Sequence, residues 1–155
     1  EEAERLLQEE KWLEAKLDGC ERRMERGGRS KHTSLLEPLQ EAAARGEESL
    51  GQHWLMDKSW QMLADLSERN DQHQDAEAFA RRRIAFQERA YPGLSGTRAW
   101  TLELYGDMLV KHCSGKVEPS VKVPDAQAAQ KLAGEAPKVY EASLRILRDM
   151  FGEKH

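Results

Sequence analysis

The stretch WQMLADLSERNDQHQDA, residues 60–76, places two apolar segments on either side of a polar, turn-prone run. Trp60, Leu63 and Ala64 recur at the three- and four-residue spacing of one helix face. The run ERNDQHQD that follows is rich in residues that favour turns, and Ala76 opens the next apolar segment. These residues predict a hairpin of two helices, in which the small side chain at 64 lets the partner helix approach closely.

The same spacing recurs further along the chain. Leu102, Tyr105 and Gly106 take the first three places, and Ala136 takes the fourth if an inserted loop at about 114–135 lies inside the second hairpin. The tetratricopeptide pattern consists of an aromatic residue, a Leu three residues later, a Gly or Ala next to it, and an Ala after the turn. We therefore expect an all-α fold, in which tetratricopeptide-like antiparallel helical hairpins stack as a short superhelix.

Caps and helix breakers predict six or seven helices. Ser34 with Glu37 forms a capping box for the second helix, and Thr97 is the expected cap of the fifth. Trp12 and Ala15 indicate a third, partial repeat, in which the first helix is the second member of a hairpin and its partner precedes this chain. The expected helices are Glu1 to about Arg26, one from Ser34, one from about Gln52, Asp75 to about Tyr91, one from Thr97, a short one after Asp125 that is separate or fused to the last, and Ala136 to about Phe151.

Composition narrows the classes of function. The 155 residues suit a single domain, 1–155, and 34% charged residues with few β-branched ones favour helices. A net charge of −4 with both signs interspersed gives no field that would draw the chain to nucleic acid or an anionic membrane. Cys20 and Cys113 lie far apart, which argues against a disulfide framework or a zinc site and favours two buried thiols.

Motifs of catalysis are missing from the sequence. No phosphate-binding, dinucleotide or nucleophile motif occurs, so we expect no catalysis, metal or cofactor in this chain alone. No signal peptide or membrane-length apolar run occurs, which indicates an intracellular protein, cytoplasmic or nuclear. The abrupt first and last residues suggest a fragment of a larger protein. The five histidines share no metal-ligand spacing and are expected at solvent-exposed positions: His32, His53, His73, His112 and His155.

Two segments resemble a known family. RRRIAFQERAYPGLSGTRAWTLELYGDMLVKH (81–112) and YEASLRILRDMFGEKH (140–155) are similar to the C-terminal helical domain of the SET-and-MYND-domain lysine methyltransferases, a tetratricopeptide-like array that also resembles kinesin light chains. The shared features are the Tyr91-Pro92-Gly93 step, LELYGDML, and a last helix ending in Gly-x-x-His. The resemblance covers about residues 52–155. The 114–135 insertion, Gly46 and Gly51 depart from the family pattern.

The resemblance implies a role beside an enzyme. Such a domain packs next to a catalytic SET domain, forms one wall of the substrate cleft and binds other proteins. S-adenosylmethionine and zinc would belong to the missing catalytic part, because none of its signatures occurs in this sequence. The alternative is a free-standing adaptor or scaffold of kinesin-light-chain type, with no enzymatic activity. Residues upstream of Glu1 would separate the two.

The repeat register also predicts a peptide groove, lined by the first helix of each hairpin. Its centre would be acidic, which disfavours binding of a carboxylate and suits a Lys/Arg-rich protein or peptide. The alternative is that these charges are only solvated. The candidate residues are Lys58, Gln61, Asp65 and Arg69 from one hairpin and Trp100, Glu103, Asp107 and Lys111 from the next.

The sequence also predicts which side chains of several helices are exposed and which face inward. Trp54 and Trp100 are not explained by the repeat core: exposed, they would mark an interface, including a possible homodimer contact, and the alternative is burial between hairpins. Residues 81–83 are all Arg and are expected to face mostly solvent. The expected inner face of their helix is Ala76, Phe79, Ala80, Ile84 and Ala90, and that of the first helix is Leu6, Leu13, Leu17, Cys20 and Met24.

Overall fold

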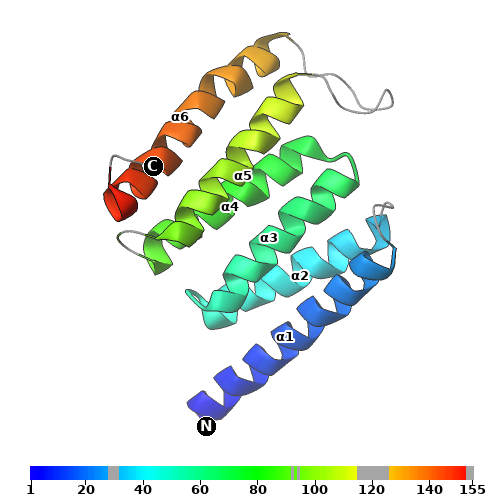
Figure 1. The fold of residues 1–155 in the computed structure, drawn as a ribbon. Coiled ribbons are helices and arrows are strands. Elements are labelled where there is room, and N and C mark those ends of the chain that lie inside the picture. Colours follow the sequence, from blue (N-terminus) through cyan, green and yellow to red (C-terminus); the bar gives the residue numbers. More distant parts are fainter. Residues whose placement is uncertain (28–31, 92, 94, 115–125, 153–155) are drawn as a thin grey trace. The chain divides into compact units, whose positions relative to one another are not determined.

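A computed structural model describes residues 1–27, 32–91, 93, 95–114 and 126–152, and in these ranges all regular secondary structure is α-helical (Figure 1). The all-α prediction is thereby confirmed, and the stacking of neighbouring helices fits a helical repeat. None of the described helices is long and apolar enough to cross a membrane. The helices are α1 (Glu2–Arg26), α2 (Thr33–Leu50), α3 (Trp54–Arg69), α4 (His73–Ala90), α5 (Gly96–Cys113) and α6 (Ala126–Phe151).

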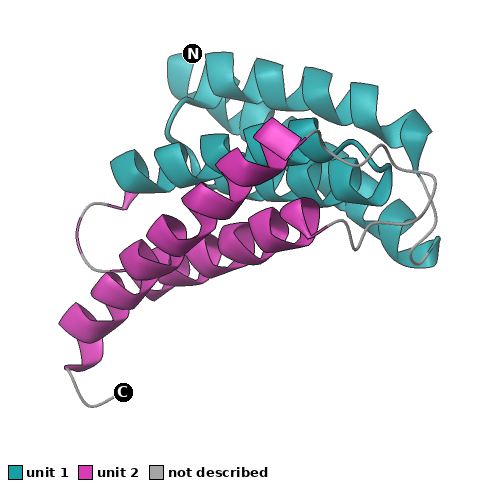
Figure 2. Ribbon diagram, turned by 90° about the horizontal axis from the view of Figure 1, so that it is seen from above, with its two compact units in different colours: residues 1–90 teal, residues 91–155 magenta. Residues whose placement is uncertain are grey.

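The chain divides into two compact units, Glu1–Ala90 and Tyr91–His155 (Figure 2). In the first unit each helix packs against the next, and α1 also contacts α3. Because α1 and α3 touch while α2 packs on both, α1 pairs with α2 as the first member of a hairpin. The interpretation of Trp12 and Ala15 as second-helix positions is therefore wrong. The single domain 1–155 stays a prediction.

The core of the first unit is built from the apolar faces that the helical spacing predicts. Leu13 and Leu17 of α1 are fully buried, and Met24 is nearly so. In the predicted hairpin at residues 60–76, the four pattern residues Trp60, Leu63, Ala64 and Ala76 are all buried. Leu6 differs from the expectation, because it is 38% exposed. At these positions the core thus follows the sequence pattern, and Leu6 at the amino-terminal end of α1 departs from it.

Gly46 is a contact point of three helices rather than a weak place in α2. A Cβ atom built there would lie 2.7 Å from Cδ2 of Leu13 in α1 and 3.0 Å from Sδ of Met56 in α3. The helix continues through this residue to Leu50. The lack of a side chain at this position lets α2 lie close to both neighbours without displacing Leu13 or Met56.

The second unit consists of α5 and α6 packed along their lengths. Gly106 has the role that the repeat predicts: a Cβ there would lie 2.8 Å from two ring atoms of Tyr140 in α6. The Ser143 hydroxyl donates to the carbonyl of Ala99 at 2.8 Å. The Tyr105 hydroxyl donates to Glu135 at 2.7 Å. Close approach at a glycine is thus combined with polar contacts between the helices.

Three helix boundaries differ from the prediction. No side chain caps α2, which begins at Thr33, so Ser34 lies inside the helix and the capping box is wrong. The cap of α5 is Ser95, whose side chain accepts from Arg98 N, so Thr97 lies within the helix. Residues 126–135 are the first part of α6, which corrects the extent of the predicted loop. Residues 115–125 lie outside the described part.

Several expected exposures also differ. His112 is only 2% exposed, and His32, His53 and His73 are half-buried, which corrects the expectation of solvent-exposed histidines; His155 lies outside the described residues. Cys20 and Cys113 are free thiols, as expected, but partly rather than fully buried. Arg81 and Arg82 are exposed as expected, whereas Arg83 is not. On α4, Phe79, Ile84 and Ala90 are half-buried rather than buried. The buried residues besides Ala76 and Ala80 are Glu77, Phe86 and Gln87.

Candidate protein-interaction surface

The charges predicted for the α3 side of the groove are occupied by contacts within the first unit. The ammonium group of Lys58 lies 3.0 Å from a carboxylate oxygen of Asp18 and 3.0 Å from one of Glu21, both in α1. Partial burial opposes the charged form, but the hydrogen bonds to Glu21 and Asp18 outweigh it and raise the pKa of Lys58. This lysine therefore joins α3 to α1.

Arg69 and Asp65 also pair with each other. A guanidinium nitrogen of Arg69 lies 2.9 Å from a carboxylate oxygen of Asp65, one helical turn away. Another donates to the backbone carbonyl of Met24 near the end of α1, at 3.4 Å. Gln61, one helical turn before Asp65, is exposed. Along α3, the candidate groove charges are thus balanced within the unit.

The candidate residues of α5 are different. Trp100, Glu103, Asp107 and Lys111 are all exposed, Trp100 to 62%, and Leu104 beside them is 43% exposed. Residues three, four and seven positions apart share one face of a helix, so these side chains form a continuous stripe. We call Trp100, Glu103, Leu104 and Asp107 the α5 stripe. It combines a large aromatic ring, an aliphatic side chain and two carboxylates.

Tyr140 of α6 contacts this stripe. Its hydroxyl donates to a carboxylate oxygen of Asp107 at 2.5 Å. That hydrogen bond, together with partial burial and the nearby charges of Asp107 and Glu103, raises the pKa of Tyr140 to about 12. Within the described residues, neither Glu103 nor Asp107 has an ion pair. The stripe thus carries two carboxylates one turn apart that form no ion pair with another described residue.

The groove of eight residues stays a prediction, since its two halves belong to different units. All four α5 residues lie on the surface. Of the α3 residues, Gln61 and Asp65 are exposed, and Lys58 and Arg69 are half-buried. The two tryptophans that the repeat core does not explain are both exposed, Trp54 to 49% and Trp100 to 62%. Burial between hairpins is therefore wrong for both.

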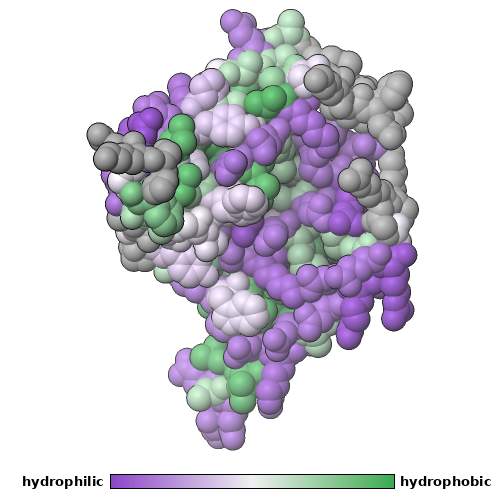
Figure 3. Space-filling model, in the orientation of Figure 1, coloured by the Kyte–Doolittle hydropathy of each residue, from purple (hydrophilic) through white to green (hydrophobic). Residues whose placement is uncertain are grey.

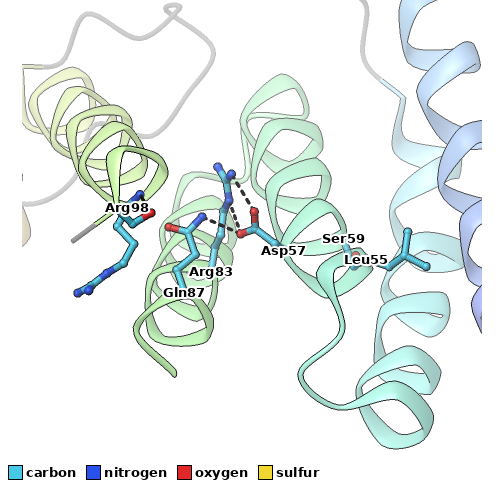
Figure 4. Close-up of polar contacts among 7 residues, drawn as sticks. Leu55, Asp57, Ser59, Arg83, Gln87 and Arg98 are labelled. Carbon is cyan, nitrogen blue, oxygen red and sulfur yellow. Dashed lines mark hydrogen bonds and ion pairs between the residues drawn. The ribbon is translucent and has the colours of Figure 1, made fainter. Parts of the chain in front are cut away.

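A polar cluster that the sequence did not reveal joins α3 to α4. Both carboxylate oxygens of Asp57 accept from Arg83, at 3.0 and 3.3 Å, and one of them also accepts from the Gln87 amide at 2.8 Å (Figure 4). The Asp57 and Arg83 side chains are 16% and 11% exposed. Arg83 and Gln87 lie one turn apart on α4, a spacing that could have indicated a shared partner. Because these side chains are mostly buried, the cluster is a structural contact between α3 and α4.

Two tryptophans of the first unit hold a cation over their rings. The guanidinium carbon of Arg45 lies 4.0 Å from the ring centroid of Trp12, and Arg45 is also bound by Glu9 at 2.6 Å. The guanidinium carbon of Arg82 lies 4.6 Å from the ring centroid of Trp60. Its nitrogen approaches Glu47 at 3.7 Å. Each site combines a Trp ring, an arginine and a carboxylate.

The face of the molecule shown in Figure 3 is mostly hydrophilic, with hydrophobic side chains in small patches. Comparison with protein-family models finds none that matches this chain, and no curated protein matches it.

Proposed function

We propose that this chain is a protein-interaction module that binds a Lys/Arg-rich protein or peptide. The observation that carries the proposal is the α5 stripe, where the exposed Trp100 and Leu104 lie on the same helix face as Glu103 and Asp107, two carboxylates without an ion pair to another described residue. Exposed aromatic residues are typical of binding surfaces, and unbalanced negative charge attracts basic partners. A helical-repeat stack supplies a rigid support for such a surface.

We further propose that the module belongs to a SET-domain protein-lysine methyltransferase and lies beside its substrate cleft. This part rests on the resemblance of residues 81–112 and 140–155 to the SET-and-MYND-domain family. The methyl-transfer chemistry, S-adenosylmethionine and zinc belong in this proposal to residues outside the chain, and no residue here is assigned to them. The corresponding location is intracellular, in the cytoplasm or nucleus.

A free-standing adaptor of kinesin-light-chain type is the second candidate. The same stripe favours it equally, because protein binding requires no attached enzyme. The exposed Trp54 and Trp100 also suit a contact between two copies of the chain.

The two candidates are separated by the longer protein that the gene encodes. A SET signature upstream of Glu1, and transfer of a radiolabelled methyl group from S-adenosylmethionine to a lysine-rich protein, would support the first. Upstream helical repeats or a coiled coil, with no methyl transfer, would contradict it and support the adaptor.

Binding of a basic partner is tested with the double variant Glu103→Lys, Asp107→Lys. We expect it to weaken binding of a lysine-rich peptide about tenfold or more at low salt, and to reduce the dependence of binding on salt, because attraction becomes repulsion. Circular dichroism checks that the variant is folded. Unchanged affinity and salt dependence would contradict the proposed partner.

A further inference from the structure

Trp100 differs from the other three tryptophans of the chain. Trp12 and Trp60 each carry an arginine over the ring, at 4.0 and 4.6 Å. Trp54 lies against the ring of His53, with the centroids 5.8 Å apart. In the part of the chain that the structure describes, Trp100 has neither a ring nor a cation against it, although it is the most exposed of the four.

The two arginine sites in the first unit show which groups accompany an arginine that lies over a Trp ring. At Trp12 the arginine is held by Glu9, three residues away on the same helix, and comes from α2. At Trp60 both the arginine and its carboxylate come from neighbouring helices. Residues three positions apart are neighbours on a helix surface, so Glu103, three residues after Trp100, lies next to that ring, as Glu9, three residues before Trp12, lies next to the Trp12 ring. The ring and the carboxylate are present on α5, and the arginine is not.

The carboxylates of the α5 stripe are available for a ligand. Glu103 is exposed, and it lies four residues from Asp107, a spacing at which like charges repel each other and a cation between them is favoured. One carboxylate oxygen of Asp107 accepts the hydrogen bond from the Tyr140 hydroxyl, and the other oxygen remains for a ligand. On α3, by contrast, the exposed carboxylate of Asp65 is already paired with Arg69.

We propose that Trp100 and Glu103 form a binding site for an arginine side chain of another protein. The guanidinium group lies over the Trp100 ring and pairs with Glu103, Asp107 adds a second negative charge, and an apolar residue next to the arginine packs on Leu104. The planar guanidinium suits both contacts, because it stacks on aromatic rings and binds carboxylates through two parallel hydrogen bonds. This inference rests on the proposed function and narrows its partner from any basic segment to one with an exposed arginine.

The test uses the whole chain and three fluorescent peptides that contain Arg-Leu, Lys-Leu or citrulline-Leu in the same neutral background. Citrulline has nearly the shape of arginine without its charge. From one exposed ion pair and one exposed cation–π contact, we expect the arginine peptide to bind about fivefold or more tightly than the citrulline peptide, with lysine between them.

Substitutions on α5 are compared with matched substitutions elsewhere. Trp100→Ala and Glu103→Gln should each weaken binding of the arginine peptide about threefold or more, and should bring its affinity close to that of the citrulline peptide. The controls are Trp54→Ala, which removes the other exposed tryptophan, and Asp65→Asn, which removes a carboxylate already paired. Both should change binding less than about twofold.

Equal binding of the arginine and citrulline peptides, or equal losses in the α5 variants and the controls, would overturn the arginine site. Binding of the lysine-rich peptide that is sensitive to the Glu103→Lys, Asp107→Lys variant would then leave the proposed function standing. Failure of the wild-type chain to bind any basic peptide would contradict both.

Discussion

Gly106 shows how one missing side chain sets the distance between two helices. Its place in the repeat pattern predicted a close approach, and the Tyr140 ring occupies the space a Cβ would take. We expect Gly106→Ala to lower the free energy of unfolding by about 1–3 kcal/mol, because a rigid ring that is hydrogen-bonded to Asp107 has to move. Urea unfolding followed by circular dichroism measures this loss.

Gly46→Ala is the matched comparison. The atoms closest to its Cβ are the far ends of the flexible Leu13 and Met56 side chains, which can shift. Alanine is also favoured over glycine in a helix by about 1 kcal/mol, so the two effects nearly cancel. A loss at Gly46 as large as that at Gly106 would contradict the account of Gly106, which depends on the rigidity of its neighbour.

The titration of Tyr140 is a second prediction at this scale. Its pKa of about 12 lies above the ordinary tyrosine value of about 10, so its contribution to stability is complete below about pH 10 and is lost as the pH rises through about 12. Ultraviolet absorbance of tyrosinate should show a step near pH 12 that Tyr140→Phe removes. Asp107→Ala should move the step towards pH 10. A step that persists in the Tyr140→Phe variant would contradict the assignment.

At the scale of elements, the Asp57 cluster fixes how α3 and α4 pair. Asp57→Ala leaves the guanidinium group of Arg83 and the amide of Gln87 without the acceptor that they share, in a mostly buried position. We expect a loss of about 2–4 kcal/mol in the free energy of unfolding. The control, Asp65→Ala, removes a surface pair and should cost about 0.5 kcal/mol or less. Similar losses in urea unfolding would show that the Asp57 cluster is no stronger than a surface pair.

Helix ends were less predictable than helix faces. The apolar spacing correctly predicted the burial of Leu13, Leu17 and the hairpin at residues 60–76, because burial of a helix face involves many residues at once. Caps depend on one side chain and on the path of the preceding chain. The sequence analysis selected Thr97 as the cap of α5, and only the structure shows that Ser95, where the backbone is extended, accepts from the helix instead.

At the scale of the whole molecule, the first unit has a core of its own. Its helices α1 to α4 pack on one another, and Leu39 of α2 is fully buried among them. We expect a fragment of residues 1–90 to unfold cooperatively in urea. Leu39→Ala should destabilise both the fragment and the whole chain by about 3 kcal/mol. Gradual unfolding of the fragment, or a loss confined to the whole chain, would show that these residues do not form an independent core.

The sequence by itself determined the helical class, the core faces, the hairpin at residues 60–76 and the close approach at Gly106, because periodic burial and small residues act locally along a helix. Only the tertiary structure decided which charges are balanced. Lys58 of α3 pairs with Asp18 and Glu21 of α1, and Asp57 of α3 pairs with Arg83 of α4. Partners of long, flexible charged side chains depend on how neighbouring helices are aligned, and spacing along one helix does not specify that alignment. These contacts distinguish the paired charges of α3 from Glu103 and Asp107, which form no ion pair with another described residue.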